Sequence, residues 1–312
     1  MANDDQPFPR IARLPLEKVR CTERSTVQRA ILEFVTDLSK NGQKKLDMLA
    51  KFFAKIFLAD EKLFVDLFGP FMDFLRNNPQ VDFMDLMLHA QNFKASIGAN
   101  AITRLLATGT INALDLETIL PKSSTNPKGI TLLAILLKRA GTAGGILQDT
   151  FADSLVQIVF PEGSFMVDPT KPPSMDFMAK IMKNLQILGN LYRKKVPIEM
   201  LLERIGEKQG PQAVLFILLM LGQGILSEEE IGEILQKIDN EGFTEMFQAA
   251  KKNMESMLPP GVKQAFNARS AAGSTRPGSP IRGPAIPRLP GSGILQRISA
   301  RLLSWLARLR KD

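Results

Sequence analysis

The chain has 312 residues, of which 45% are hydrophobic and 23% charged, so it can bury a substantial core in one or two domains. A single cysteine, Cys21, excludes an intramolecular disulfide framework, and the acidic, polar residues 1–5 do not resemble the start of a secretory signal. The formal net charge of +8 is concentrated in residues 263–312, which carry ten basic residues against one acid. Subtracting this +9 leaves residues 1–262 at −1, so the sequence joins a near-neutral body to a cationic arm.

Residues 1–25 contain three prolines among scattered charges and are predicted to form an extended N-terminal arm. From about residue 26 onward, apolar residues recur at intervals of three and four, which indicates amphipathic helices at 27–38, 46–57, 63–75, 81–93, 99–106, 130–139 and 146–159. Pro70 is expected to bend or split the third of these. Nine of the nineteen phenylalanines lie in 52–93 on the apolar stripe, which favours core packing over stacking on nucleic-acid bases.

A Pro-rich stretch at 160–173 is the best internal boundary of the body, and a helix is expected after it at 175–192. Proline is tolerated in a first helical turn, so Pro197 and Pro211 predict helices that begin at residues 198 and 212. The apolar window 213–221 is too short for the roughly 20 residues that span a bilayer and indicates a buried core helix. Ser227 and Glu230 have the spacing of a capping box, and a last helix is expected at 245–257.

No run alternates apolar and polar residues over the length of a strand, so the fold class is predicted to be all-α. We expect a two-lobed helical body with a disordered basic C-terminal arm that ends in an amphipathic helix. The predicted parts are the extended arm 1–25, an N-terminal lobe 26–160, a C-terminal lobe 174–258, a Gly/Pro/Ser/Arg linker 259–292 and the basic amphipathic helix 293–312.

The last predicted helix combines an apolar stripe with flanking arginines, an arrangement typical of helices that lie in a membrane interface. The same amphipathic pattern is also compatible with docking in the groove of a partner protein. The predicted membrane-binding or partner-binding residues are Ile298, Arg301, Leu302, Trp305, Arg308 and Leu309.

Residues suited to catalysis are scarce. His89 is the only histidine, so the chain lacks the His and Cys ligands of a tetrahedral zinc site and offers few positioned bases for a nucleophile. We interpret His89 as a packing or surface residue and Cys21 as an ordinary thiol. The sequence therefore predicts no catalytic residue, no metal, no cofactor and no small-molecule substrate, and the chain is predicted not to be an enzyme.

Arg193, Lys194 and Lys195 form the main basic cluster of the body. One interpretation is a solvated helix end, where cations are favourable, and the other is a contact with phosphates or the nuclear-import machinery. With residues 168–169, 175–176 and Lys180, the run 191–195 resembles the central helical stretch of orthomyxovirus matrix proteins. In that family a Leu-Tyr-Arg-Lys run opens a basic RNA-binding and nuclear-import segment.

The resemblance covers roughly residues 95–225 and includes the short pieces 115–117 and 128–130. It implies an all-helical, self-associating layer protein between membrane and ribonucleoprotein, and it carries over an RNA-binding role to Arg193, Lys194 and Lys195 only. Pro197 departs from the family, because the basic run continues there in matrix proteins. Residues 129–133 and 192–194 also resemble helical nucleocapsid-associated transcription factors of filoviruses, but this chain cannot build the Cys3His zinc finger of that family.

These observations predict a matrix-like viral structural protein that associates with itself and bridges an anionic membrane surface to viral ribonucleoprotein or RNA. Its expected locations are the virion, the host cytoplasm or nucleus, and the membrane periphery, without secretion through a signal peptide. One alternative is a nucleocapsid or nucleic-acid-coating protein whose cationic arm contacts phosphates. The other is a cellular helical adaptor that docks by its C-terminal helix.

Overall fold

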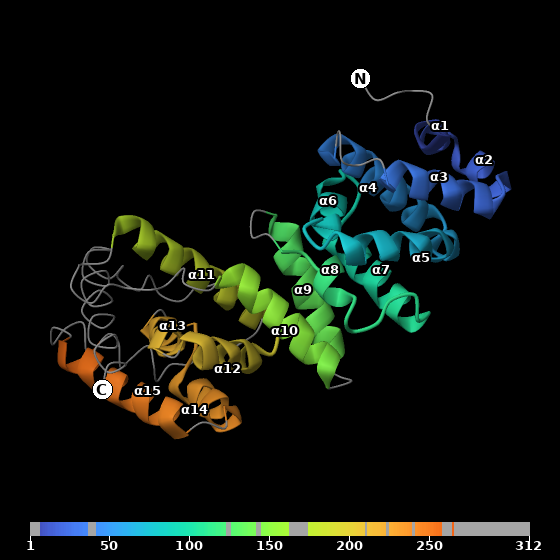
Figure 1. Ribbon diagram of the computed structural model, residues 1–312. Helices are drawn as coiled ribbons and strands as arrows, with labels where there is room; N and C mark the ends of the chain where they lie inside the picture. Colours follow the sequence, from blue (N-terminus) through green and yellow to red (C-terminus); the bar gives the residue numbers. More distant parts are fainter. Residues whose placement is uncertain are drawn as a thin grey trace, which may run out of the picture. The chain divides into compact units, whose positions relative to one another are not determined.

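The computed structural model describes residues 7–36, 42–122, 126–141, 145–161, 174–209, 211–222, 225–238, 241–257 and 264. Within these residues the regular secondary structure consists of fifteen α-helices, without a β-strand (Figure 1). The prediction of an all-α fold is therefore confirmed. The chain divides into two compact units, Met1–Ile158 and Val159–Asp312, which we describe one at a time.

Unit 1 is built from helices that pack mainly on near neighbours in the chain. Helices α3 and α4 pack against α5, α4 also packs against α6, and α7 packs against α9. The described helices that begin in unit 1 are α1 (Pro7–Arg13), α2 (Leu16–Cys21), α3 (Arg24–Thr36), α4 (Gly42–Ala59), α5 (Glu61–Asn77), α6 (Phe83–His89), α7 (Ala95–Ala107), α8 (Leu116–Ile119), α9 (Pro127–Ala140) and α10 (Ile146–Val159). They are coloured from blue to green in Figure 1.

A cluster of phenylalanine rings forms the core of unit 1 around Phe53 on α4. Four of its five ring neighbours stand edge-on to it, a geometry that adds about 0.5–1.5 kcal/mol per pair beyond the burial of area. The prediction that these rings pack in the core is confirmed. The centroid distances from Phe53 are 5.5–6.0 Å for Phe52, Phe64, Phe68, Phe71 and Phe83, each at most 2% exposed.

The predicted extended arm at 1–25 is wrong where the structure describes it, because α1 and α2 occupy most of the segment. Phe8 on α1 is fully buried, with its ring centroid 4.6 Å from that of Phe34 and 5.1 Å from that of Phe52. Pro7 and Pro9 lie in the first turn of α1, where the missing N–H costs no intrahelical hydrogen bond. The third proline directly precedes α2. The prolines thus begin helices, and the burial of Phe8 stabilises the first of them.

Helix α5 continues through Pro70, so the proline does not split it. In a regular helix the N–H of residue 70 would donate to the carbonyl of residue 66, and proline has no such donor. The side-chain amide of Gln28 on α3 donates to this carbonyl instead, with 2.9 Å between Gln28 Nε2 and Asp66 O. A neighbouring helix therefore satisfies the backbone acceptor that Pro70 leaves open.

Unit 2 is arranged around one central apolar helix. Its described helices are α11 (Met175–Arg193), α12 (Ile198–Gln209), α13 (Pro211–Gly222), α14 (Glu228–Lys237) and α15 (Glu241–Met257). The other four all pack against α13, in which every residue from 213 to 221 is buried. Phe216 on α13 also meets the ring of Phe160 edge-on at 4.8 Å. The prediction that the most apolar window is a buried core helix is confirmed.

The start of α14 has the capping box that the sequence predicts. Ser227 Oγ accepts a hydrogen bond from the Glu230 N–H at 3.1 Å, and Glu230 Oε2 accepts one from the Ser227 N–H at 2.8 Å. The backbone N–H groups of Ser227 and Glu230 have no acceptor within the helix, and the capping box satisfies both. The expected start of α12 at Ile198 is also observed, whereas α13 begins at Pro211 itself, one residue earlier than expected.

Candidate functional site

The predicted nucleic-acid site lies in unit 2, where α11 ends. Arg193 is the last residue of α11, Lys194 caps the helix, and Lys195 follows in the turn, with all three side chains exposed. The next residue, Val196, is buried. The structure therefore presents the three cations together on one short stretch of surface, with an apolar anchor directly after them.

The backbone at this helix end has a Schellman motif. The Val196 N–H donates to Leu191 O at 3.1 Å and the Lys195 N–H donates to Tyr192 O at 2.8 Å, while the buried side chains of Leu191 and Val196 stand at the positions that make the accompanying apolar contact. Lys195 occupies the position usually taken by glycine and has a φ of 58°. A side chain there costs about 1–2 kcal/mol, so the cluster includes a lysine at a conformationally unfavourable position.

Part of the positive charge of the cluster interacts with its own helix. Arg193 Nε donates to Gly189 O at 3.2 Å, one turn earlier, and cations near the last turn are favourable to the helix dipole. Lys194 and Lys195 make no ion pair or side-chain hydrogen bond with the residues that the structure describes. These two lysines are the part of the cluster that is available for an anionic ligand.

Tyr192 connects the end of α11 to α14 through a hydrogen bond. Its hydroxyl donates to Glu230 Oε1, while the other oxygen of that carboxylate is held by Ser227 in the capping box. Burial first, and then this hydrogen bond and the carboxylates of Glu230, Glu233 and Glu199, raise the pKa of Tyr192 far above its usual value, so it stays a neutral donor. The basic cluster therefore directly follows a tyrosine that lies near three carboxylates.

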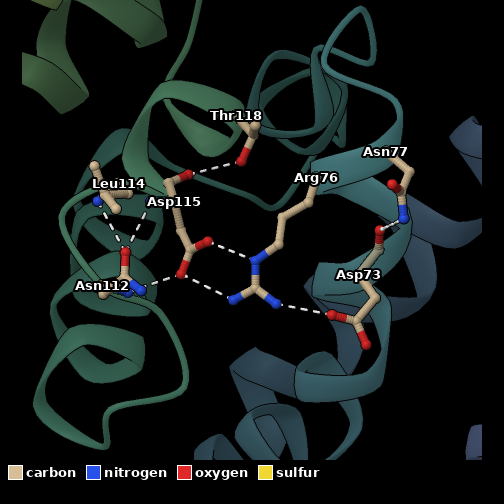
Figure 2. A network of polar contacts seen from close by, with 7 residues as sticks. All are labelled: Asp73, Arg76, Asn77, Asn112, Leu114, Asp115 and Thr118. Atoms are coloured by element: carbon tan, nitrogen blue, oxygen red, sulfur yellow. Dashed lines mark hydrogen bonds and ion pairs between the residues drawn. The ribbon is translucent and has the colours of Figure 1, made fainter.

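Figure 2 shows a polar network in unit 1, in which Arg76 on α5 contacts Asp115, the residue just before α8. Arg76 donates from Nε and Nη2 to the two oxygens of Asp115 at 2.7 and 3.1 Å, and Nη1 donates to Asp73 at 2.8 Å. The Asn112 N–H also donates to Asp115. The hydrogen bond from Arg76 is the main cause that lowers the pKa of Asp115, whose side chain is only 5% exposed. This bidentate pair holds the loop before α8 against α5.

A second basic side chain in unit 1, Lys128, donates hydrogen bonds to backbone carbonyl oxygens. Lys128 Nζ, on α9, donates to Leu88 O at 2.8 Å and to Phe93 O at 3.2 Å, near the end of α6. Asp115 and Lys128 both lie in the short pieces that resemble matrix proteins, and here both have structural partners. The sequence does not predict these roles, because the partners are 35–40 residues away in the chain.

The residues considered for catalysis lie on the surface. His89 is exposed at the end of α6 and Cys21 is exposed at the end of α2. Across the described ranges no group of three or more His, Cys, Asp and Glu side chains could hold a metal ion. Among the helices that the structure describes, none combines the length and the apolar character needed to cross a bilayer.

Comparisons with known proteins add no assignment. No family model, no curated protein and no solved structure matches the chain. The resemblance to orthomyxovirus matrix proteins therefore stays a prediction from sequence. The predicted membrane-binding or partner-binding residues Ile298, Arg301, Leu302, Trp305, Arg308 and Leu309 lie outside the described residues, as do the terminal helix and, apart from residue 264, the linker.

Proposed function

We propose that the chain is a non-enzymatic, matrix-like viral structural protein that associates with itself and bridges an anionic membrane to viral ribonucleoprotein. The observation that carries the proposal is the division of charge, with +9 in residues 263–312 and −1 in the helical body. Such a chain can attach by its cationic segment while the near-neutral body avoids repelling a second copy. The virion, the host cytoplasm or nucleus and the membrane periphery are the corresponding locations.

The arrangement that goes with this function is a two-lobed helical body, a flexible linker at 259–292 and a basic amphipathic helix at 293–312. At helical spacing, Ile298, Leu302, Trp305 and Leu309 share one face, and arginines flank it. Anionic lipid would attract the arginines and the apolar face would be buried among the acyl chains. Binding to lipid by this segment requires both parts, whereas binding to phosphates requires the charge alone.

The membrane part of the proposal is tested by vesicle co-sedimentation beside an RNA-binding titration. Replacing Leu302 and Trp305 by serine should abolish binding of the full chain to anionic vesicles and leave its net charge unchanged. Replacing Leu303 and Ala307 by serine is the matched control, because these positions fall on the opposite side of the expected helix. Equal vesicle binding by both double variants would refute the membrane role, and wild-type binding to RNA but not to vesicles would favour a nucleic-acid-coating protein.

The ribonucleoprotein part depends on the cluster at the end of α11. Replacing Arg193, Lys194 and Lys195 by alanine should weaken binding to single-stranded RNA and lower the slope of log K against log salt by about 1.4 if the two lysines alone contact phosphates and by about 2 if Arg193 does so as well, since each lost phosphate contact removes about 0.7. The charge-matched control replaces three other exposed lysines by alanine, Lys94 and Lys138 in unit 1 and Lys252 on α15. An unchanged slope in the cluster variant would assign it to a solvated helix end.

A further inference from the structure

Helix α4 presents positively charged side chains to solvent. It contains four lysines and one acid, a net charge of +3, while the rest of residues 1–262 sums to −4. The solvent-facing positions of α4 include Lys44, Asp47, Lys51 and Lys55, which recur at three and four residues and therefore form one stripe, here called the α4 face. Lys45 is turned inward, with Nζ 5.2 Å from the centroid of the Phe34 ring.

The lysines of the α4 face retain their charge for an external partner. Lys44 and Lys51 make no ion pair or side-chain hydrogen bond with the described residues, and Lys55 donates to the backbone oxygen of Leu14 at 2.7 Å. That contact brings the α4 face next to the residue that follows α1. Elsewhere in unit 1, exposed arginines such as Arg20 and Arg24 are paired with carboxylates.

We propose that the α4 face binds the phosphate backbone of a single-stranded nucleic acid. From Lys44 to Lys55 the stripe is about 16 Å long at 1.5 Å per residue, which is long enough to contact successive phosphates of one strand. The large apolar side chain that is exposed on α4 is Leu58, which is 48% exposed and lies one turn beyond Lys55. Membrane-surface helices need a broad apolar face, so a linear polyanion fits this surface better than a bilayer. The proposal does not depend on the cluster at Arg193 or on the C-terminal segment.

The first test removes charge from the α4 face in the full chain. We expect the K44Q/K51Q variant to bind a fluorescein-labelled 20-nucleotide poly(U) RNA with a salt slope lowered by about 1.4, and the exposed control K94Q/K138Q to keep the wild-type slope. The cationic C-terminal segment is present in both variants, so its contribution cancels in the comparison. Equal slopes for the two variants would overturn the proposal.

The second test seeks a gain of affinity, which partial unfolding cannot mimic. Asp47 lies between Lys44 and Lys51 and makes no ion pair with the described residues, so D47N should tighten poly(U) binding about threefold at low salt. The control E117Q removes an exposed acid on α8 and should leave the affinity unchanged. Failure of D47N to tighten RNA binding would overturn the proposal. It would also be overturned if K44Q/K51Q lost binding to phosphatidylserine vesicles but kept its RNA binding. Because neither variant touches Arg193 to Lys195, the result is separate from the test of that cluster.

Discussion

The contact between Gln28 and the carbonyl of Asp66 makes a quantitative prediction about unit 1. We expect Gln28→Met, which keeps the length of the side chain and removes its donor, to lower the free energy of unfolding by about 1–2 kcal/mol. This is the usual cost of leaving a partly buried backbone acceptor without its partner. Because Pro70 cannot donate to that carbonyl, no backbone group of α5 can replace Gln28.

A second substitution isolates this explanation. In a Pro70→Ala background, the N–H of residue 70 can donate to Asp66 O, so Gln28→Met should cost only a few tenths of a kcal/mol. The coupling between the two substitutions should therefore be about 1 kcal/mol, which corresponds to a shift of about 2–4 °C in Tm for a unit of this size. Gln91→Met, at an exposed position after α6, is the control and should have no effect.

The assay is equilibrium urea unfolding followed by far-UV circular dichroism. The single tryptophan and the single tyrosine both lie in unit 2, so their fluorescence does not report on unit 1. If Gln28→Met costs the same free energy with proline and with alanine at position 70, Gln28 does not substitute for the missing N–H, and the continuity of α5 needs another explanation.

Three further predictions concern other sites. Lys195→Gly should raise the free energy of unfolding of unit 2 by about 1 kcal/mol in urea unfolding, because glycine relieves the positive φ, whereas Lys195→Ala should give no such gain. Arg76→Met should lower the free energy of unfolding by about 2 kcal/mol at pH 7. Because the pKa of Asp115 is lower in the folded protein than in the unfolded chain, the stability that the pair contributes is present above about pH 4 and is lost as the pH falls through the folded pKa. The free energy of unfolding should therefore depend less on pH in the variant when it is followed through an acid titration. His89→Gln and Cys21→Ser, both at exposed positions, should leave vesicle and RNA binding unchanged, and a loss of either in a folded variant would contradict the interpretation of these residues as a surface histidine and an ordinary thiol.

Much of the helical framework could be predicted from local sequence. Apolar residues at intervals of three and four located most helices, the nine-residue apolar window identified the buried α13, and the spacing of Ser227 and Glu230 identified the capping box. These signals are local, because the residues that make them lie within one or two helical turns. The wrong expectation for residues 7–21 has a tertiary cause: Phe8 fills a space between Phe34 and Phe52 that only the folded unit provides.

Which charges remain available for a partner could not be predicted in the same way. In the sequence, Arg76, Lys128, Lys51 and Lys194 are equivalent cations, yet the fold commits the first two to oxygens 35–40 residues away. Charge that is already paired inside the protein contributes little to binding a phosphate, because its own partner would have to be released first. The exposed lysines at the end of α11 and on the α4 face keep their charge and, within each site, also lie close to one another, so phosphate contacts by the described residues should concentrate there. A uniform loss of RNA affinity on replacing any exposed lysine, irrespective of these two sites, would show that net charge alone governs binding.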